Sequence, residues 1–168
     1  LLKDVQTETF FTVSSGTFFI DLNGNTWHCT YISGMALNLE GSADSRVSIT
    51  FKDSAGNGSF TTAGSYSVYK RGYATAIFEG GSYGGIAWYE TVGNLLAEGY
   101  VYRNNSDGLV VTDTSGKNIY NVTVTPAPVK ITAQPEDAVA TPGYTEAPTF
   151  SIMAETMPEE SGETITYQ

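Results

Sequence analysis

Apolar and polar residues alternate with a period of two along most of residues 1–125. In the clearest run, Val47, Ile49 and Phe51 alternate with polar residues, and similar runs cover 35–39 and 120–124. A strand that buries one face and exposes the other produces this pattern, and antiparallel sheets are its usual source. We therefore predict on the order of ten β-strands and no helix longer than a single turn.

Clusters of Gly, Asn, Asp and Ser separate the apolar runs. They lie at 54–58, 104–108 and 114–117. Such residues supply the positive φ angles that tight turns require. Short strands that follow one another at regular spacing are typical of a sandwich or a barrel. For residues 1–125 we predict an all-β fold, namely an antiparallel sandwich or a jelly-roll-like domain.

The segment FFIDLNGNTWHCTYI, residues 18–32, has two interpretations. Asp21, Asn23 and Asn25 alternate as oxygen ligands do in calcium-binding loops. The same residues contain an Asn-Gly turn, which is the strongest short-range signal of a β-hairpin. In such a hairpin Asp21 points away from Asn25, and the twelfth position of an EF-hand loop holds Ile32 instead of Glu. We therefore predict a hairpin and no metal site at this turn.

The hairpin register places one set of apolar side chains on a single face, which we expect to lie in the core. These residues are Phe18, Ile20, Leu22, Trp27, Cys29 and Tyr31. His28 and Cys29 are neighbours on a strand, so they project to opposite faces and cannot form a catalytic dyad. The chain contains one His and one Cys, which excludes a multi-histidine metal site, a disulfide framework and a Cys-rich zinc site.

Two motifs that would mark an enzyme are missing from the sequence. There is no His-Glu-x-x-His and no Walker loop. The glycine-rich segment 80–85 has the composition of a phosphate-binding loop, but a strand pattern follows it instead of a helix. We interpret it as a mobile hairpin tip that carries Tyr83. We predict a non-enzymatic protein with no catalytic residue, no metal and no cofactor.

Aromatic residues are concentrated between positions 66 and 102. In the pair 88–89 and the segment 100–102, both faces of a strand carry large side chains, so some rings should reach the surface. Exposed Trp and Tyr side chains can stack on sugar rings or anchor a protein partner. Alternatively, a two-layer fold covers both faces, or the rings form cross-strand pairs. The candidate binding residues are Tyr83, Trp88, Tyr89, Tyr100 and Tyr102.

The chain is acidic, with a formal net charge of −10 and a pI near 4.3. A nucleic-acid-binding surface requires clustered Lys and Arg, whereas the basic residues here are scattered. No apolar stretch approaches the roughly 20 residues that span a bilayer. We therefore expect no binding to nucleic acid and no membrane insertion.

The composition of the chain changes near residue 126. All six prolines lie at or after this position, whereas most of the glycines precede it. A change of composition at a proline-rich segment indicates a domain boundary. We predict a sandwich or barrel domain at 1–125, a Pro-rich linker at 126–128 and a partial domain at 129–168.

Residues 129–168 resemble the start of a bacterial immunoglobulin-like repeat. The resemblance rests on a proline after the first strand, a glycine before the second, an alternating run and a Tyr-Gln strand. These are Pro135, Gly143, Phe150–Ala154, Tyr167 and Gln168. Such repeats occur in cell-surface adhesins, secreted glycan-active proteins and phage virion proteins. The resemblance implies an immunoglobulin-like segment, an extracellular, cell-surface or phage virion setting, and a role in assembly.

These observations predict a non-enzymatic extracellular structural or adhesion protein that is part of a surface, fibre or virion assembly. Its partners would be other protein subunits or further modules of the same chain. The alternative is a carbohydrate-binding module that uses exposed Trp and Tyr to bind glycans. A segment of about 40 residues rarely buries enough apolar surface to fold alone. We therefore expect residues 129–168 to complete their β-structure with further chain or with a neighbouring subunit.

Overall fold

The computed structural model describes residues 1–89, 95–114, 116, 118–133 and 153–156. The chain divides into two compact units, Leu1–Pro126 and Ala127–Gln168. Every regular element in the described ranges is a β-strand. No helix there has the length and apolar character needed to cross a membrane.

The first unit contains the strands β1 to β12, and the second contains β13 and β14. Their bounds are β1 (Val5–Thr7), β2 (Phe11–Val13), β3 (Gly16–Asp21), β4 (Thr26–Cys29), β5 (Met35–Gly41), β6 (Val47–Lys52), β7 (Ser59–Thr62), β8 (Tyr66–Gly72), β9 (Ala74–Glu79), β10 (Gly81–Trp88), β11 (Tyr100–Asn104), β12 (Asn118–Pro126), β13 (Val129–Ala133) and β14 (Met153–Thr156).

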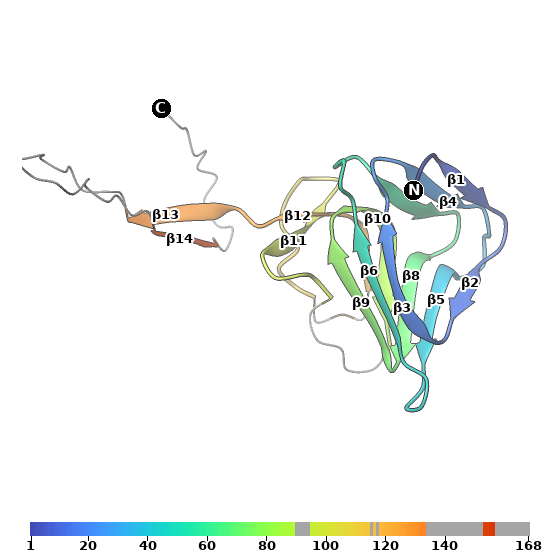
Figure 1. Ribbon diagram of the computed structural model, residues 1–168. Coiled ribbons are helices and arrows are strands. Elements are labelled where there is room, and N and C mark those ends of the chain that lie inside the picture. Colours follow the sequence, from blue (N-terminus) through green and yellow to red (C-terminus); the bar gives the residue numbers. More distant parts are fainter. Residues whose placement is uncertain (90–94, 115, 117, 134–152, 157–168) are drawn as a thin grey trace, which may run out of the picture. The chain divides into compact units, whose positions relative to one another are not determined.

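Parallel strands form three walls in the first unit (Figure 1). Wall A consists of β1, β4, β7 and the first half of β10. Wall B consists of β2, β5, β8 and the second half of β10. Wall C consists of β3, β6 and β9. Each set of three consecutive strands makes one coil, and the next coil stacks beside it, which is the architecture of a parallel β-solenoid.

Walls A and B form one continuous curled sheet because β10 belongs to both. The predicted antiparallel sandwich or jelly-roll-like fold is therefore wrong, and the described residues show no immunoglobulin fold. A solenoid strand has an apolar inner face and a polar outer face, so it gives the same alternation as an antiparallel strand. The all-β content is confirmed, whereas the strand direction is not.

The second unit is described only at β13 and β14, which pair in antiparallel fashion. Most of the residues that carry the immunoglobulin-like resemblance, including Pro135, Gly143 and Tyr167, lie outside the described residues. The resemblance therefore stays a prediction.

The Asn23-Gly24 turn is present, but it does not make a hairpin. Both residues have positive φ angles, 50° and 73°. However, β3 pairs with β6, and β4 pairs with β1 and β7. The turn is a corner at which the chain passes from wall C to wall A and starts the second coil. Asp21 accepts hydrogen bonds from the N–H groups of Ser54 and Asn23, at 3.0 and 2.9 Å, and the bond from Ser54 is the main reason that its pKa is lowered.

The glycine-rich segment is part of strand β10 and is not a hairpin tip. Gly84 and Gly85 lie where β10 leaves wall A, beside β7, and joins wall B, beside β8. A Cβ atom at Gly85 would lie 2.6 Å from the carbonyl oxygen of Ser65, so only glycine fits this corner. Strand β10 pairs with β7 and β8 on one side and with β12 on the other. The predicted hairpin tip is therefore wrong, because this glycine-rich segment is a paired strand.

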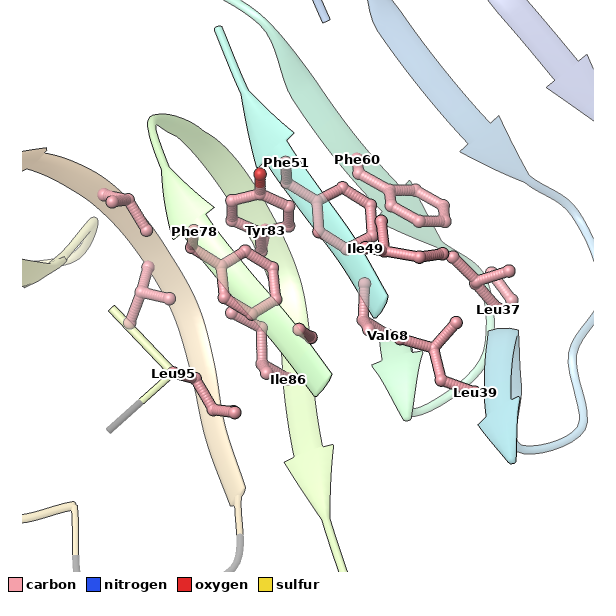
Figure 2. Packing of buried hydrophobic residues seen from close by; sticks show 14 of the residues in the cluster. Leu37, Leu39, Ile49, Phe51, Phe60, Val68, Phe78, Tyr83, Ile86 and Leu95 are labelled. Carbon is pink, nitrogen blue, oxygen red and sulfur yellow. The ribbon is translucent and has the colours of Figure 1, made fainter. Parts of the chain in front are cut away.

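Inward side chains from neighbouring coils stack inside the solenoid (Figure 2). The rings of Trp27 and Phe60 are parallel, with centroids 4.2 Å apart, and those of Phe51 and Phe78 are parallel at 5.0 Å. Tyr83 makes edge contacts with both Phe51 and Phe78, at centroid distances of 6.0 and 4.8 Å. These ring stacks connect wall A with wall C and form the centre of the core.

The two ends of the solenoid differ. At the C-terminal end, β12 runs antiparallel to β10 and β11 runs antiparallel to β12, while Leu95 and Ala97 bond to the backbone of Phe78 in β9. The last coil is therefore covered. At the N-terminal end, the outer edges of β1, β2 and β3 have no strand partner within the described part of the chain.

Candidate functional site

The N-terminal end of the solenoid is hollow and apolar. A cavity of about 410 Å³ opens between the strands of the first coil, and no charged side chain lines it. Its walls include Val5 from β1, Phe11 and Val13 from β2, and Phe18 and Ile20 from β3. We call this surface, defined by these five residues, the open end.

The exposure of the open end follows from the stacking register. Phe11 lies beside Leu37 of the second coil, and Phe18 lies beside Ile49. The two second-coil residues are both 2% exposed, whereas Phe11 and Phe18 are 44% and 43% exposed. Equivalent inward positions are thus exposed in the first coil and buried in the second, because no described residue covers the first coil.

Free strand edges surround the hollow. Among the described residues, the first-coil strands β1, β2 and β3 each pair on one side only, with β4, β5 and β6. Unpaired backbone N–H and C=O groups on a strand edge are a template for pairing with another chain. The open end therefore combines an apolar surface with three edges that can accept further strands.

The expected core face at 18–31 is only partly buried for the same reason. Leu22 and Cys29 are fully buried, but Ile20 and Trp27 are half-buried beside the open end, and Tyr31 is half-buried against the core. His28 lies on the opposite face from Cys29, as predicted, and its Nδ1 atom is 2.8 Å from the hydroxyl of Thr61. In the part of the chain that the structure describes, no cluster of three His, Cys, Asp or Glu side chains could hold a metal ion.

The five candidate binding residues do not form one site. Tyr83 and Tyr102 are 1% and 2% exposed, so both rings belong to the core and cannot reach an external ligand. Trp88 and Tyr100 are half-buried and pack against the core, whereas Tyr89 is exposed. Burial is the main cause that raises the pKa of both Tyr83 and Tyr102.

The two buried tyrosines differ in their hydrogen bonds, which gives a direct prediction. The hydroxyl of Tyr83 donates to the carbonyl of Gly80 at 2.8 Å, whereas that of Tyr102 is buried with no partner in the described residues. Tyr83→Phe should therefore lower the free energy of unfolding by about 1 kcal/mol, and Tyr102→Phe should leave it unchanged or raise it. Urea denaturation of both variants checks this. A loss in Tyr102→Phe as large as that in Tyr83→Phe would contradict it.

A different group of aromatic residues lies on the outer surface of wall B. It consists of Tyr66 and Tyr69 from β8 and Tyr120 from β12. The sequence pattern of 120–124 places Tyr120 on the same face as Val122 and Val124. In the structure both valines are buried and Tyr120 is 48% exposed, because Asn121 has a φ of 50° and interrupts the alternation.

The chain matches no protein-family model, no curated protein and no solved structure. Two features of its surface have the chemistry of a binding site, namely the open end and the tyrosines on wall B.

Proposed function

We propose that the chain is a non-enzymatic structural protein of an extracellular assembly, and that it joins a second copy of itself through the open end. The observation that supports this is the combination, at one end of the solenoid, of an apolar cavity without charged side chains and three strand edges that have no partner in the described part of the chain. Burial of apolar surface is favourable at about 25 cal/mol per Å², and pairing of the edges satisfies their backbone groups.

The geometry of the two ends favours a closed dimer over a fibre. Head-to-tail stacking would bring the open end against the C-terminal end. There β12 already pairs with most of β10, so that edge of β10 cannot accept a strand from another copy. Two open ends can meet instead through a two-fold axis, which pairs edge strands antiparallel and is the commonest symmetry of protein dimers. This contact leaves the covered ends free on both sides.

Electrostatics also favours a second copy at the open end. Each chain carries a formal charge of −10, so two copies repel one another as they approach. No charged side chain lines the cavity at the open end, and two copies can approach there without burying a charged side chain. The open end is thus the surface on which self-association costs least.

The extracellular setting of the proposal rests on residues 129–168. Their resemblance to bacterial immunoglobulin-like repeats implies a cell surface or a phage virion. Further protein subunits or modules of the same chain would then carry the dimer within the larger assembly. Catalysis forms no part of the proposed role.

A charged residue at the open end should prevent dimerisation. Phe18→Glu places a carboxylate in the apolar contact, so this variant should stay monomeric. The mass of the unmodified protein should rise from that of a monomer to that of a dimer as its concentration increases. Analytical ultracentrifugation measures both, up to about 100 μM, a range that detects micromolar association. The matched control is Leu109→Glu, because Leu109 is a 63% exposed apolar residue that bonds to β11 at the covered end.

Circular dichroism establishes that each variant is folded. The proposal fails if the protein stays monomeric throughout this range. It also fails if Leu109→Glu dissociates the dimer as completely as Phe18→Glu does.

A further inference from the structure

Three tyrosines and an asparagine form a continuous group on the outer surface of wall B. The rings of Tyr66 and Tyr120 are stacked with centroids 5.6 Å apart, and Tyr69 lies 6.2 Å from Tyr66. Asn118 lies on β12, two residues before Tyr120, and its amide nitrogen donates hydrogen bonds to the hydroxyls of Tyr66 and Tyr120. We call Tyr66, Tyr69, Tyr120 and Asn118 the tyrosine platform.

Hydrogen bonds hold the platform in one arrangement. The hydroxyl of Tyr120 donates to that of Tyr66 at 2.9 Å, and the Asn118 amide N–H₂ donates to both hydroxyls, at 3.0 Å to Tyr120 and 3.4 Å to Tyr66. Accepting these bonds lowers the pKa of Tyr66, and donating to Tyr66 raises that of Tyr120. The rings are therefore positioned before any ligand arrives, which reduces the entropy cost of binding.

The same bonds leave one donor and one acceptor available to a ligand. The Tyr66 oxygen accepts two hydrogen bonds, so its own hydroxyl hydrogen is available to donate to a ligand. The carbonyl oxygen of the Asn118 side chain accepts no hydrogen bond from the described residues, although its amide nitrogen donates two. A donor and an acceptor thus lie beside exposed aromatic surface.

Sugars match this combination of groups. The C–H face of a pyranose ring stacks on aromatic rings, and its hydroxyls both donate and accept hydrogen bonds. The platform residues are uncharged at neutral pH. On the neighbouring part of wall B, Arg71 is paired with Glu40 at 2.5 Å, so it does not present a free positive charge to an anionic ligand. The chemistry therefore favours a neutral ligand.

We propose that the tyrosine platform binds a neutral glycan, with a sugar ring stacked on Tyr120 and hydrogen-bonded to Tyr66 and Asn118. The platform is built on β8 and β12, whereas the open end is built on β1, β2 and β3. Glycan binding therefore does not require dimerisation, and each can fail without the other.

Isothermal titration calorimetry with defined oligosaccharides tests the proposal. The probes are cellohexaose, maltohexaose and mannohexaose as neutral glycans, and an oligogalacturonide as an acidic one. We expect at least one neutral probe to bind. Tyr120→Ala should weaken its affinity about tenfold or more, because truncation of an aromatic contact removes most of its binding energy. Asn118→Ala should weaken it several-fold.

A second exposed tyrosine provides the control. Tyr73 is 54% exposed and lies between β8 and β9, outside the platform, so Tyr73→Ala should bind the probe as the parent does. Phe18→Glu should also bind normally, which separates this site from the open end. If Tyr120→Ala does not fold, Tyr120→Phe and Asn118→Ala decide, because both retain the ring stack.

Three results would overturn the proposal. The first is that none of the neutral probes binds at about 10 mM, a concentration at which even millimolar affinity is detected. The second is that folded Tyr120→Ala binds as tightly as the parent. If Tyr120→Ala does not fold, the equivalent result is that the single variants Asn118→Ala and Tyr120→Phe both bind as tightly as the parent. The third is that only the oligogalacturonide binds.

Discussion

Replacing Phe51 by alanine should lower the free energy of unfolding by about 3–5 kcal/mol. Phe51 is fully buried on wall C and contacts three other rings. Its centroid lies 5.0 Å from Phe78, 6.0 Å from Tyr83 and 6.4 Å from Phe60. Phe60 belongs to wall A and Tyr83 to the strand that joins walls A and B (Figure 2). A cavity here cannot close without moving several coils, so most of the cost should remain.

Urea denaturation followed by tryptophan fluorescence measures this loss. Phe19→Ala is the matched control, because Phe19 is on the neighbouring strand β3, pairs with Thr50 and not with a core residue, and is 79% exposed. Its removal should change stability by less than about 0.5 kcal/mol. Similar losses in the two variants would mean that the ring stack is not the centre of the core.

The sequence predicts individual strands well because alternation is a local property. Val47, Ile49 and Phe51 are predicted to share a buried face, and all three are buried in β6. The Asn23-Gly24 turn is also predicted correctly, since its positive φ angles depend on these two residues alone. Both results concern single elements and not their partners.

Strand pairing could not be predicted from the same pattern. Consecutive strands such as β3 and β4 lie in different walls, and each strand pairs with the equivalent strand of the next coil. In wall A, Val5 pairs with Trp27, Trp27 with Phe60, and Phe60 with Tyr83. The spacing between these partners is uneven, so the chain shows no fixed repeat that would indicate a solenoid.

The binding surface could be predicted only as a class of residue. The predicted candidate Tyr89 is exposed, but the tyrosines that lie together come from β8 and β12, which the coil topology brings together. The density of aromatic residues favoured Tyr83 and Tyr102 instead. Both are core residues because β10 and β11 are covered in the structure, which a local pattern does not reveal.

The second and third coils approach each other closely at a corner between walls B and C, where Gly41 leaves no room for a side chain. Gly41 pairs with Gly72 of the next coil, and its carbonyl accepts a hydrogen bond from the N–H of Tyr73 at 3.1 Å. A Cβ atom at Gly41 would overlap the carbonyl group of Tyr73. The obstacle is backbone, which cannot rotate away as a side chain does.

Gly41→Ala should therefore lower the free energy of unfolding by about 3 kcal/mol, which is a large effect for the addition of one methyl group. Thermal and urea denaturation measure the loss. Gly116→Ala is the control, because a Cβ there meets no atom closer than 3.9 Å and its backbone φ is not in the positive region. Gly116→Ala should change stability by less than about 0.5 kcal/mol. Equal stability of the two variants would contradict the close stacking of the second and third coils, and with it the solenoid on which both proposed surfaces depend.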